Sequence, residues 1–234
     1  MPRKQLQEMV LMYRFELHTH TAECDKFAHL GGAELVGAYF EKGYSGMVVT
    51  DHYFNHFFDW FADELDGLGK NKIIERWLKG YYTARSEGEK IGFTVLPGAE
   101  VRIDGTINDY LIFGLEEKDF YALPLLNRLG SIDEVIDLLP DYACVVAAHP
   151  FRNGMTVFDP ERIFGIEVFN GGTEPFRNEI AHIFAKHYGK AMTSGSDCHS
   201  MHAVGKGGII TNVPIKTTAD LRSILKNGNY QIIY

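Results

Sequence analysis

Short apolar runs of strand length alternate with longer amphipathic segments along the chain. Seven such runs are rich in Val, Ile, Phe and Tyr, and they span residues 13–17, 46–50, 93–97, 110–114, 144–148, 165–169 and 190–193. Helix-length segments lie between them at 33–42, 71–90, 131–139 and 177–187. This alternation predicts parallel strands joined by crossover helices. Near-continuous apolar runs such as Met47-Val48-Val49 are typical of strands buried on both faces.

The pattern predicts an α/β fold, and seven β/α units favour a distorted (β/α)7 TIM-like barrel over an open sheet. No linker or internal repeat interrupts it, so we expect residues 1–234 to form a single domain. An aromatic-rich insertion at 55–82 is either a helix pair packed on the barrel or a lid or pocket wall over the site. At the C-terminal end, a helix with Thr218 as its N-cap is expected to extend to Asn227.

Composition and charge narrow the class of protein. Of the 234 residues, 45% are hydrophobic and 23% charged, which is globular composition. The net charge of −8 disfavours duplex nucleic acid and membrane surfaces as partners and favours a small substrate. The three cysteines show no C-x-x-C spacing, which predicts neither a disulfide framework nor a zinc ribbon. Without a signal peptide or a membrane-length apolar stretch, we expect a cytoplasmic protein.

Histidines and carboxylates stand where the predicted strands end. They are His18, His20, Asp25, His52, Glu100, His149, Asp197 and His199. Residues at i and i+2 of an extended segment point the same way, so His18 and His20 can reach one ion. The carboxyl ends of barrel strands converge on one mouth, and the sequence therefore predicts a polynuclear metal site there. Nitrogen and hard oxygen ligands suit Zn, Mn or Fe.

Together these residues resemble the motif series of the PHP family, named for polymerase and histidinol phosphatase domains, from residue 16 to about 208. The resemblance implies a distorted barrel of seven β/α units, a trinuclear metal centre and phosphoesterase activity. It implies one ion bound by His18, His20, Glu100 and Asp197, a second that shares Glu100 and adds His149, and a third bound by Asp25, His52 and His199.

One departure from the family pattern concerns the strand at 110–114. Many members carry a further metal-binding histidine there, and this chain has none. Either Asp109 substitutes for it, or the second ion has few protein ligands. We therefore expect two to three divalent metal ions.

The expected reaction is metal-dependent hydrolysis of a phosphate ester by a metal-bound hydroxide. Catalytic roles are predicted for His52, Asp197 and His199. Near the mouth, Arg102 and Arg152 are predicted to contact substrate, since a guanidinium pairs with phosphate oxygens. Asn170 is predicted either to contact substrate or to position the metal ligands.

Several substrates and two other activities stay open. A nucleotide, histidinol phosphate or a short oligonucleotide end all fit the resemblance. The alternatives are a metal-dependent amide or lactone hydrolase and a non-catalytic metal-binding regulatory module. The sequence does not predict the oligomeric state.

Overall fold

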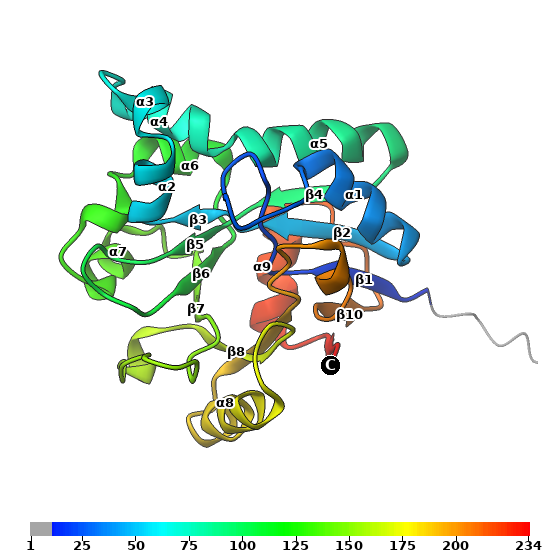
Figure 1. Cartoon of the computed structure of the whole chain (residues 1–234). Helices are drawn as coiled ribbons and strands as arrows, with labels where there is room; N and C mark the ends of the chain where they lie inside the picture. The colour runs from blue at the N-terminus through cyan, green and yellow to red at the C-terminus, as the bar shows by residue number, and fades with distance from the viewer. Residues whose placement is uncertain (1–10) are drawn as a thin grey trace, which may run out of the picture.

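The strands lie in two sheets (Figure 1) in the computed structural model, which describes residues 11–234. The first sheet has the order β11-β10-β1-β2-β4 and the second β3-β5-β6-β7-β8-β9. The strands of the first are β1 (Tyr13–Glu16), β2 (Tyr44–Val49), β4 (Thr94–Pro97), β10 (Ile209–Thr211) and β11 (Gln231–Ile232). Those of the second are β3 (His52–Tyr53), β5 (Ala99–Val101), β6 (Tyr110–Phe113), β7 (Cys144–Ala147), β8 (Gly165–Asn170) and β9 (Ala191–Gly195).

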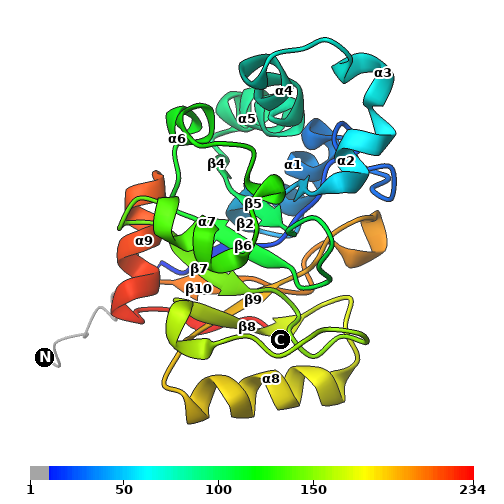
Figure 2. The same cartoon turned by 90° about the vertical axis from the view of Figure 1, so that its left-hand side faces the viewer.

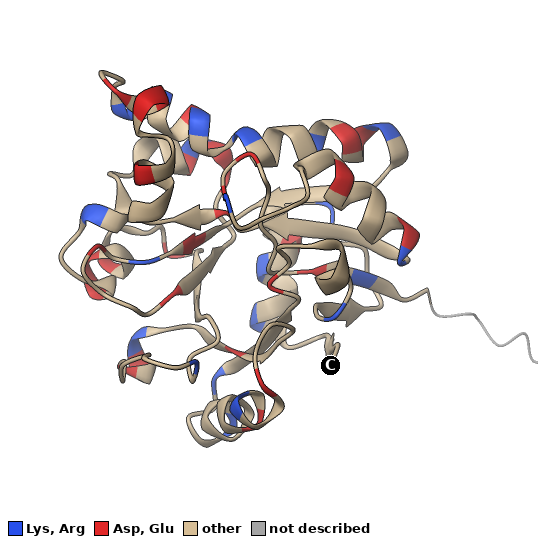
Figure 3. Ribbon diagram, viewed as in Figure 1, with Lys and Arg blue, Asp and Glu red and all other residues tan. Residues whose placement is uncertain are grey.

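Helices lie outside the sheets (Figure 2). They are α1 (Gly32–Glu41), α2 (Asn55–Trp60), α3 (Ala62–Leu65), α4 (Lys70–Trp77), α5 (Lys79–Ile91), α6 (Glu117–Ala122), α7 (Ile132–Leu138), α8 (Pro175–His187) and α9 (Thr218–Asn227). Helices α1 and α5 pack on each other over β2 and β4, and α8 packs on β8. Helix α5 carries both acidic and basic residues (Figure 3), and Arg85 pairs with Glu89 at 3.2 Å. None of the described helices is long and apolar enough to cross a membrane.

All seven predicted strands are present, but one runs in the opposite direction. Strand β6 pairs antiparallel with both β5 and β7, with Val101 opposite Tyr110 and Tyr110 opposite Ala147. The prediction of parallel strands throughout was therefore wrong here, because a loop and not a crossover helix joins β5 to β6. Asp109 precedes β6 and so lies at the end of the barrel where the parallel strands finish.

The two sheets meet where β1 and β9 end. The backbone N–H of Cys198 donates to the carbonyl of His18 at 3.2 Å, and the N–H of His20 donates to that of Cys198 at 3.1 Å. These two backbone hydrogen bonds connect the sheets at a point where no continuous strand ladder joins them in the described part of the chain. The fold is a distorted TIM-type barrel that is not closed by strand pairing among the described residues.

The strands are buried on both faces, as their apolar runs predicted. In β2, Met47 and Val49 pack in the cluster beneath α1 and α5, whereas Val48 belongs to a second cluster on the inner face. That inner cluster includes Leu111 and Phe113 of β6, and Leu221, Ile224 and Leu225 of α9 close it at one end. The opposite end is left to polar side chains.

Two helix boundaries differ from prediction. The segment 71–90 forms two helices, α4 and α5, that meet at Leu78. The N-cap of α9 is Thr217 and not Thr218, since Thr217 Oγ1 accepts from the N–H of Asp220 at 3.1 Å and Asp220 Oδ2 accepts from the N–H of Thr217 at 2.9 Å. This reciprocal capping box defines the start of the helix.

Candidate metal centre

The eight predicted ligands lie together at the carboxyl end of the barrel. Their donor atoms form three groups, and within each group the atoms lie within 4.8 Å of one another. The groups are His20, Asp25, His52 and His199; His18, Glu100 and His149; and His18, His20 and Asp197. These groups resemble the three ligand sets implied by the sequence motifs. His20 joins the set of Asp25, His52 and His199, and His18 joins the set of Glu100 and His149. The third group keeps His18, His20 and Asp197 of its implied set.

The first group centres on Asp25. Its Oδ2 lies 3.0 Å from His52 Nδ1 and 3.0 Å from His199 Nε2. Burial raises the pKa of Asp25, but hydrogen bonds from His199 and His52 outweigh it and hold the pKa well below its ordinary value. Burial, with the charges of His199 and His52, lowers the pKa of His20 to about 3. An ionised carboxylate and a neutral imidazole are the forms that bind metal.

Glu100 lies between the groups. Its Oε1 is 2.9 Å from His149 Nε2, and its Oε2 is 2.9 Å from His52 Nε2 and 3.5 Å from His18 Nε2. The short strands β3 and β5, which the sequence did not predict, set this arrangement by pairing His52 with Glu100. Glu100 belongs to the group of His18 and His149, and its Oε2 also faces His52 of another group, so this carboxylate could hold two ions.

Glu167 of β8 connects to two of the predicted ligands. Its Oε1 lies 2.8 Å from His18 Nδ1, and its Oε2 accepts from the backbone N–H of His149 at 2.8 Å. A carboxylate on one ring nitrogen fixes the imidazole tautomer and directs the other nitrogen to the donor group. Glu167 therefore positions His18.

Asn170 is also a positioning residue. Its Nδ2 donates to Glu167 Oε2 at 3.0 Å and to Asp197 Oδ2 at 3.2 Å, and its Oδ1 accepts from the N–H of Gly172 at 2.9 Å. The side chain is fully buried. These contacts fit the positioning role, one of the two roles predicted for Asn170, and its contact with a substrate stays a prediction.

Glu16 is a buried carboxylate that sequence reasoning missed. Its Oε1 accepts from the backbone N–H of His18 at 3.0 Å and of Ser196 at 2.9 Å, while Ser196 Oγ bonds to Oε2. Burial raises the pKa of Glu16. The residue joins the end of β1 to the end of β9. The available signal was a carboxylate within the strand-like run 13–17, although Arg14 also lies in that run.

Backbone strain coincides with two predicted ligands. His149 has φ of +30° and Asp197 φ of +51°, and within residues 11–234 they are the non-glycine residues with positive φ. Such conformations are costly and persist where the surroundings impose them, often at functional sites. The surroundings here include the hydrogen bond from Asn170 to Asp197.

Two arginines hold Asp109 at the rim. Arg102 donates through Nε to Asp109 Oδ1 at 2.6 Å and through Nη2 to Oδ2 at 2.7 Å, and Arg152 Nη2 donates to Oδ2 at 2.9 Å. Asp109 Oδ2 lies 3.9 Å from His149 Nε2. Asp109 belongs to none of the three donor groups found among the described residues.

Two of the three groups, those of Asp25 and of Asp197, open into a cavity of about 410 Å³. Its lining residues are Phe27, His52, Phe54, His56, Arg102, Arg152, Gly172, Asp197 and His199. Behind Phe27 and His56 stands Trp60, with ring centroids 4.9 Å and 5.3 Å away. The sequence did not assign His56 to the site. This end of the insertion forms a wall of the mouth.

The rest of the insertion packs against the fold. Trp77 and Tyr81 are buried, and Trp77 Nε1 donates to the carbonyl of His52 at 3.1 Å. Both interpretations of the segment 55–82 thus apply, each to a different part.

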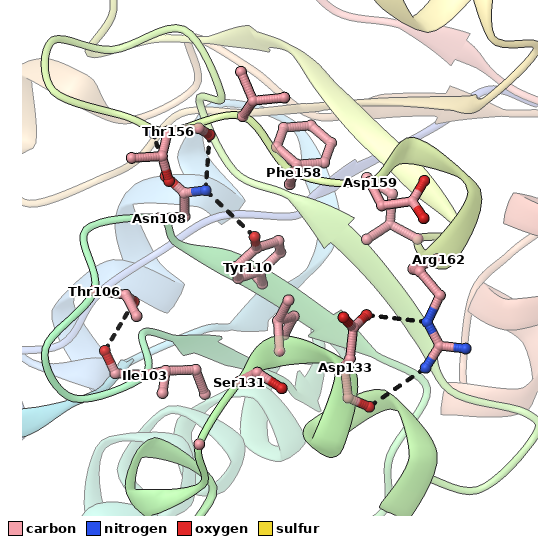
Figure 4. Close-up of a pocket in the computed structure, with 14 residues that line it drawn as sticks. Ile103, Thr106, Asn108, Tyr110, Ser131, Asp133, Thr156, Phe158, Asp159 and Arg162 are labelled. Atoms are coloured by element: carbon pink, nitrogen blue, oxygen red, sulfur yellow. Dashed lines mark hydrogen bonds and ion pairs between the residues drawn. The ribbon is translucent and has the colours of Figure 1, made fainter.

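A second cavity of about 300 Å³ lies between the 103–110 loop, the start of α7 and the 156–163 loop (Figure 4). In it Asn108 Nδ2 donates to the carbonyl of Thr156 at 2.9 Å, and Arg162 Nε donates to Asp133 Oδ1 at 3.0 Å. None of the eight predicted ligands lines it. The candidate metal ligands therefore lie at the mouth of the barrel and not in this second cavity.

Comparisons with known proteins agree with this description. Residues 175–230, from α8 to the segment after α9, match the family model described as PHP-associated. No curated protein matches the chain. This family model matches about a quarter of the chain, near its C-terminal end. The rest of the chain resembles known proteins in its fold.

Solved structures share this fold. One is a two-domain protein from Bacteroides vulgatus that contains a predicted PHP-like metal-dependent phosphoesterase: 15% identity, TM-score 0.69, covering 96% of this chain and 65% of that one. Another is an amidohydrolase from Chromobacterium violaceum: 14% identity, TM-score 0.58, covering 94% and 98%. A third is a lesion-specific endonuclease from Pyrococcus furiosus: 13% identity, TM-score 0.62, covering 95% and 58%.

The chain shares its fold with a PHP-like protein and an amidohydrolase, and its donor groups form a candidate metal site at the mouth of the barrel. The PHP-associated match and the shared fold support the PHP domain family, as the histidine and carboxylate motifs predicted. This chain spans 65% of the length of the Bacteroides vulgatus protein.

Proposed function

We propose that this protein is a metal-dependent hydrolase that cleaves a phosphate ester, and that residues 1–234 form one domain for this purpose. The observation that carries the proposal is the set of three converging donor groups. Within the described chain, His18 Nε2 and both ring nitrogens of His20 are buried and make no hydrogen bond. Buried polar atoms without partners are costly, and a bound cation would satisfy them.

The donor set fits divalent ions such as Zn, Mn or Fe, because it consists of imidazole nitrogens and carboxylate oxygens. Three overlapping groups correspond to two to three ions. When bound, such ions supply an activated water and neutralise charge on phosphate oxygens.

We assign the catalytic roles to His52, Asp197 and His199, since all three line the mouth cavity. The His199 side chain is 28% exposed, which leaves it accessible to a substrate proton. Arg102 and Arg152 line the same cavity and are assigned to the phosphate group.

The substrate proposed is a small phosphorylated molecule. A cavity of about 410 Å³ is within the size range of small-molecule sites. With a net charge of −8, the protein is expected not to bind duplex nucleic acid. A nucleotide, histidinol phosphate or an oligonucleotide end satisfies these conditions.

The shared fold with an amidohydrolase keeps an amide or lactone hydrolase as the second candidate. The same activated water serves both reactions. The two arginines at the mouth favour the phosphate ester, because the reacting group of an amide or lactone is uncharged before it is attacked. A non-catalytic metal-binding module is the third candidate.

The test is elemental analysis of gently purified protein combined with hydrolysis of p-nitrophenyl phosphate before and after chelation. Two to three ions per chain, with turnover that chelation abolishes and metal restores, is the expected result. If metal is bound but no phosphate ester is hydrolysed, the protein is assigned instead as an amide or lactone hydrolase or as a non-catalytic module. Full activity in metal-free protein contradicts the proposal.

A further inference from the structure

We propose that Asp109 is the anchor of a two-arginine phosphate-binding site and not a metal ligand. The inference rests on the proposed function for the identity of the anion. It assigns a role to the residue that stands where the motif pattern lacks a histidine.

Both oxygens of Asp109 are already bonded. Arg102 approaches in a two-pronged arrangement, at 2.6 Å and 2.7 Å, and Arg152 shares Oδ2 at 2.9 Å. The Asp109 side chain is 1% exposed, whereas those of Arg102 and Arg152 are 22% and 41% exposed. The carboxylate is therefore the buried base of the cluster, and the guanidinium groups are its solvent-facing part.

The guanidinium groups keep donors for a ligand. Within residues 11–234, Arg102 Nη1 and Arg152 Nε and Nη1 make no hydrogen bond. Both side chains line the mouth cavity beside His199 and Asp197. A planar guanidinium held by a carboxylate along one edge presents its remaining N–H groups in a fixed direction.

Charge and packing explain why the carboxylate is needed. Two guanidinium groups repel each other when close, and one ionised carboxylate between them leaves a net charge of about +1. Arg102 is held further by the ring of Phe54, with Cζ 4.5 Å from the ring centroid. A pre-positioned cationic pair loses little side-chain entropy when it binds an anion.

The position of the pair relative to the donor groups selects phosphate. Asp109 Oδ2 is 3.9 Å from His149 Nε2, and His149 belongs to the donor group with His18 and Glu100. A tetrahedral anion in the mouth cavity is within reach of both arginines and of the donor residues His52, Asp197 and His199, because all five line that cavity. Because β6 is antiparallel, its preceding residue lies at this end of the barrel.

The experiment compares Asp109→Asn with Asp133→Asn. Asp133 is a control for the loss of an aspartate–arginine pair, because it pairs with Arg162 at 3.0 Å but lies in the second cavity (Figure 4). Binding of inorganic phosphate to the metal-loaded protein is measured by calorimetry, together with metal content and with KM and kcat on p-nitrophenyl phosphate.

In Asp109→Asn we expect phosphate affinity to fall at least about tenfold and KM to rise by a similar factor, with metal content unchanged. Asp133→Asn is expected to match the parent protein. Arg102→Lys keeps the charge but loses the fork, so it should weaken phosphate binding without loss of metal. Loss of an ion in Asp109→Asn, or unchanged phosphate affinity there, overturns the inference.

Arg152→Gln keeps the inference testable if Asp109→Asn does not fold. It leaves the contact between Arg102 and Asp109 in place and should also weaken phosphate binding with metal retained. Unchanged phosphate affinity in this variant overturns the two-arginine site. Failure of the proposed function can be told apart from failure of this inference. If the proposed function is wrong, no phosphate ester is hydrolysed. Weaker phosphate binding in these variants would still support the arginine site in that case.

Discussion

His18 Nδ1 and Glu167 Oε1 lie 2.8 Å apart, although 149 positions separate the two residues along the chain. Neither side chain is exposed to solvent. The carboxylate orients the imidazole so that Nε2 faces Glu100 Oε2 at 3.5 Å and Asp197 Oδ1 at 3.6 Å. Glu167 therefore acts on the metal centre without belonging to any donor group.

Replacing Glu167 with Gln should weaken metal binding by about 10- to 100-fold, because His18 loses its charged orienting partner. Metal titration against a chromophoric chelator measures the affinity. Glu64→Gln is the control, since Glu64 pairs with Arg76 at 2.6 Å away from the donor groups. Equal affinities in the two variants would contradict the positioning role.

The donor groups should lose ions separately. Asp25→Asn is expected to remove one ion from the group of His52 and His199, and His149→Asn one from the group of His18 and Glu100. Asparagine is chosen at 149 because it tolerates the positive φ found there. Since each ion contributes several kcal/mol, turnover should fall at least about 100-fold in either variant.

Elemental analysis of both variants checks this prediction. One ion fewer per chain in each, with the remaining metal retained, is the expected result. Simultaneous loss of every ion in either variant would show that the groups do not bind independently.

A methyl group at position 80 should destabilise the fold beneath the site. A Cβ at Gly80 would lie 2.7 Å from Asp51 Oδ2 and would also collide with Thr21 Oγ1. We expect Gly80→Ala to lower the free energy of unfolding by about 1–3 kcal/mol. Gly37→Ala is the control, because nothing lies within 4 Å of its Cβ and alanine stabilises a helix interior by about 0.5–1 kcal/mol. Urea denaturation compares them, and equal shifts would refute the packing argument.

The α9 capping box should give a pH-dependent contribution to stability. Burial raises the pKa of Asp220, but hydrogen bonds from Lys216 and Thr217 outweigh it, and the net pKa is lowered from the ordinary 3.8. A lowered folded-state pKa means that the charge stabilises the fold above about pH 4. That stabilisation is lost as the pH falls through the folded-state value.

Asp220→Asn should therefore cost about 0.5 kcal/mol at pH 7, the usual value for a charge at an exposed helix N-terminus. The difference from the parent protein should narrow toward pH 3. Denaturation curves at the two pH values check this, with Asp66→Asn, an exposed position, as control. A difference that grows at low pH would reverse the sign argued here.

The predicted strands were found because each is a local signal. An apolar run such as 144–148 is long enough for one strand, and its flanking His149-Pro150 marks the end. The direction of β6, in contrast, is not indicated by the residues of that segment. It depends on pairing with β5 and β7, and a crossover helix and a loop are both compatible with the residues between.

The sequence by itself determined which residue types gather at the mouth, because strand ends and i, i+2 spacing place His18 and His20 there without further information. Only the tertiary structure decided the partners of these residues. Glu167 meets His18, and Asp109 meets Arg102 and Arg152, through strand pairings that no local pattern specifies. The physical reason is that side-chain type and periodicity are properties of a segment, whereas a hydrogen bond between distant segments depends on register and direction across the whole barrel.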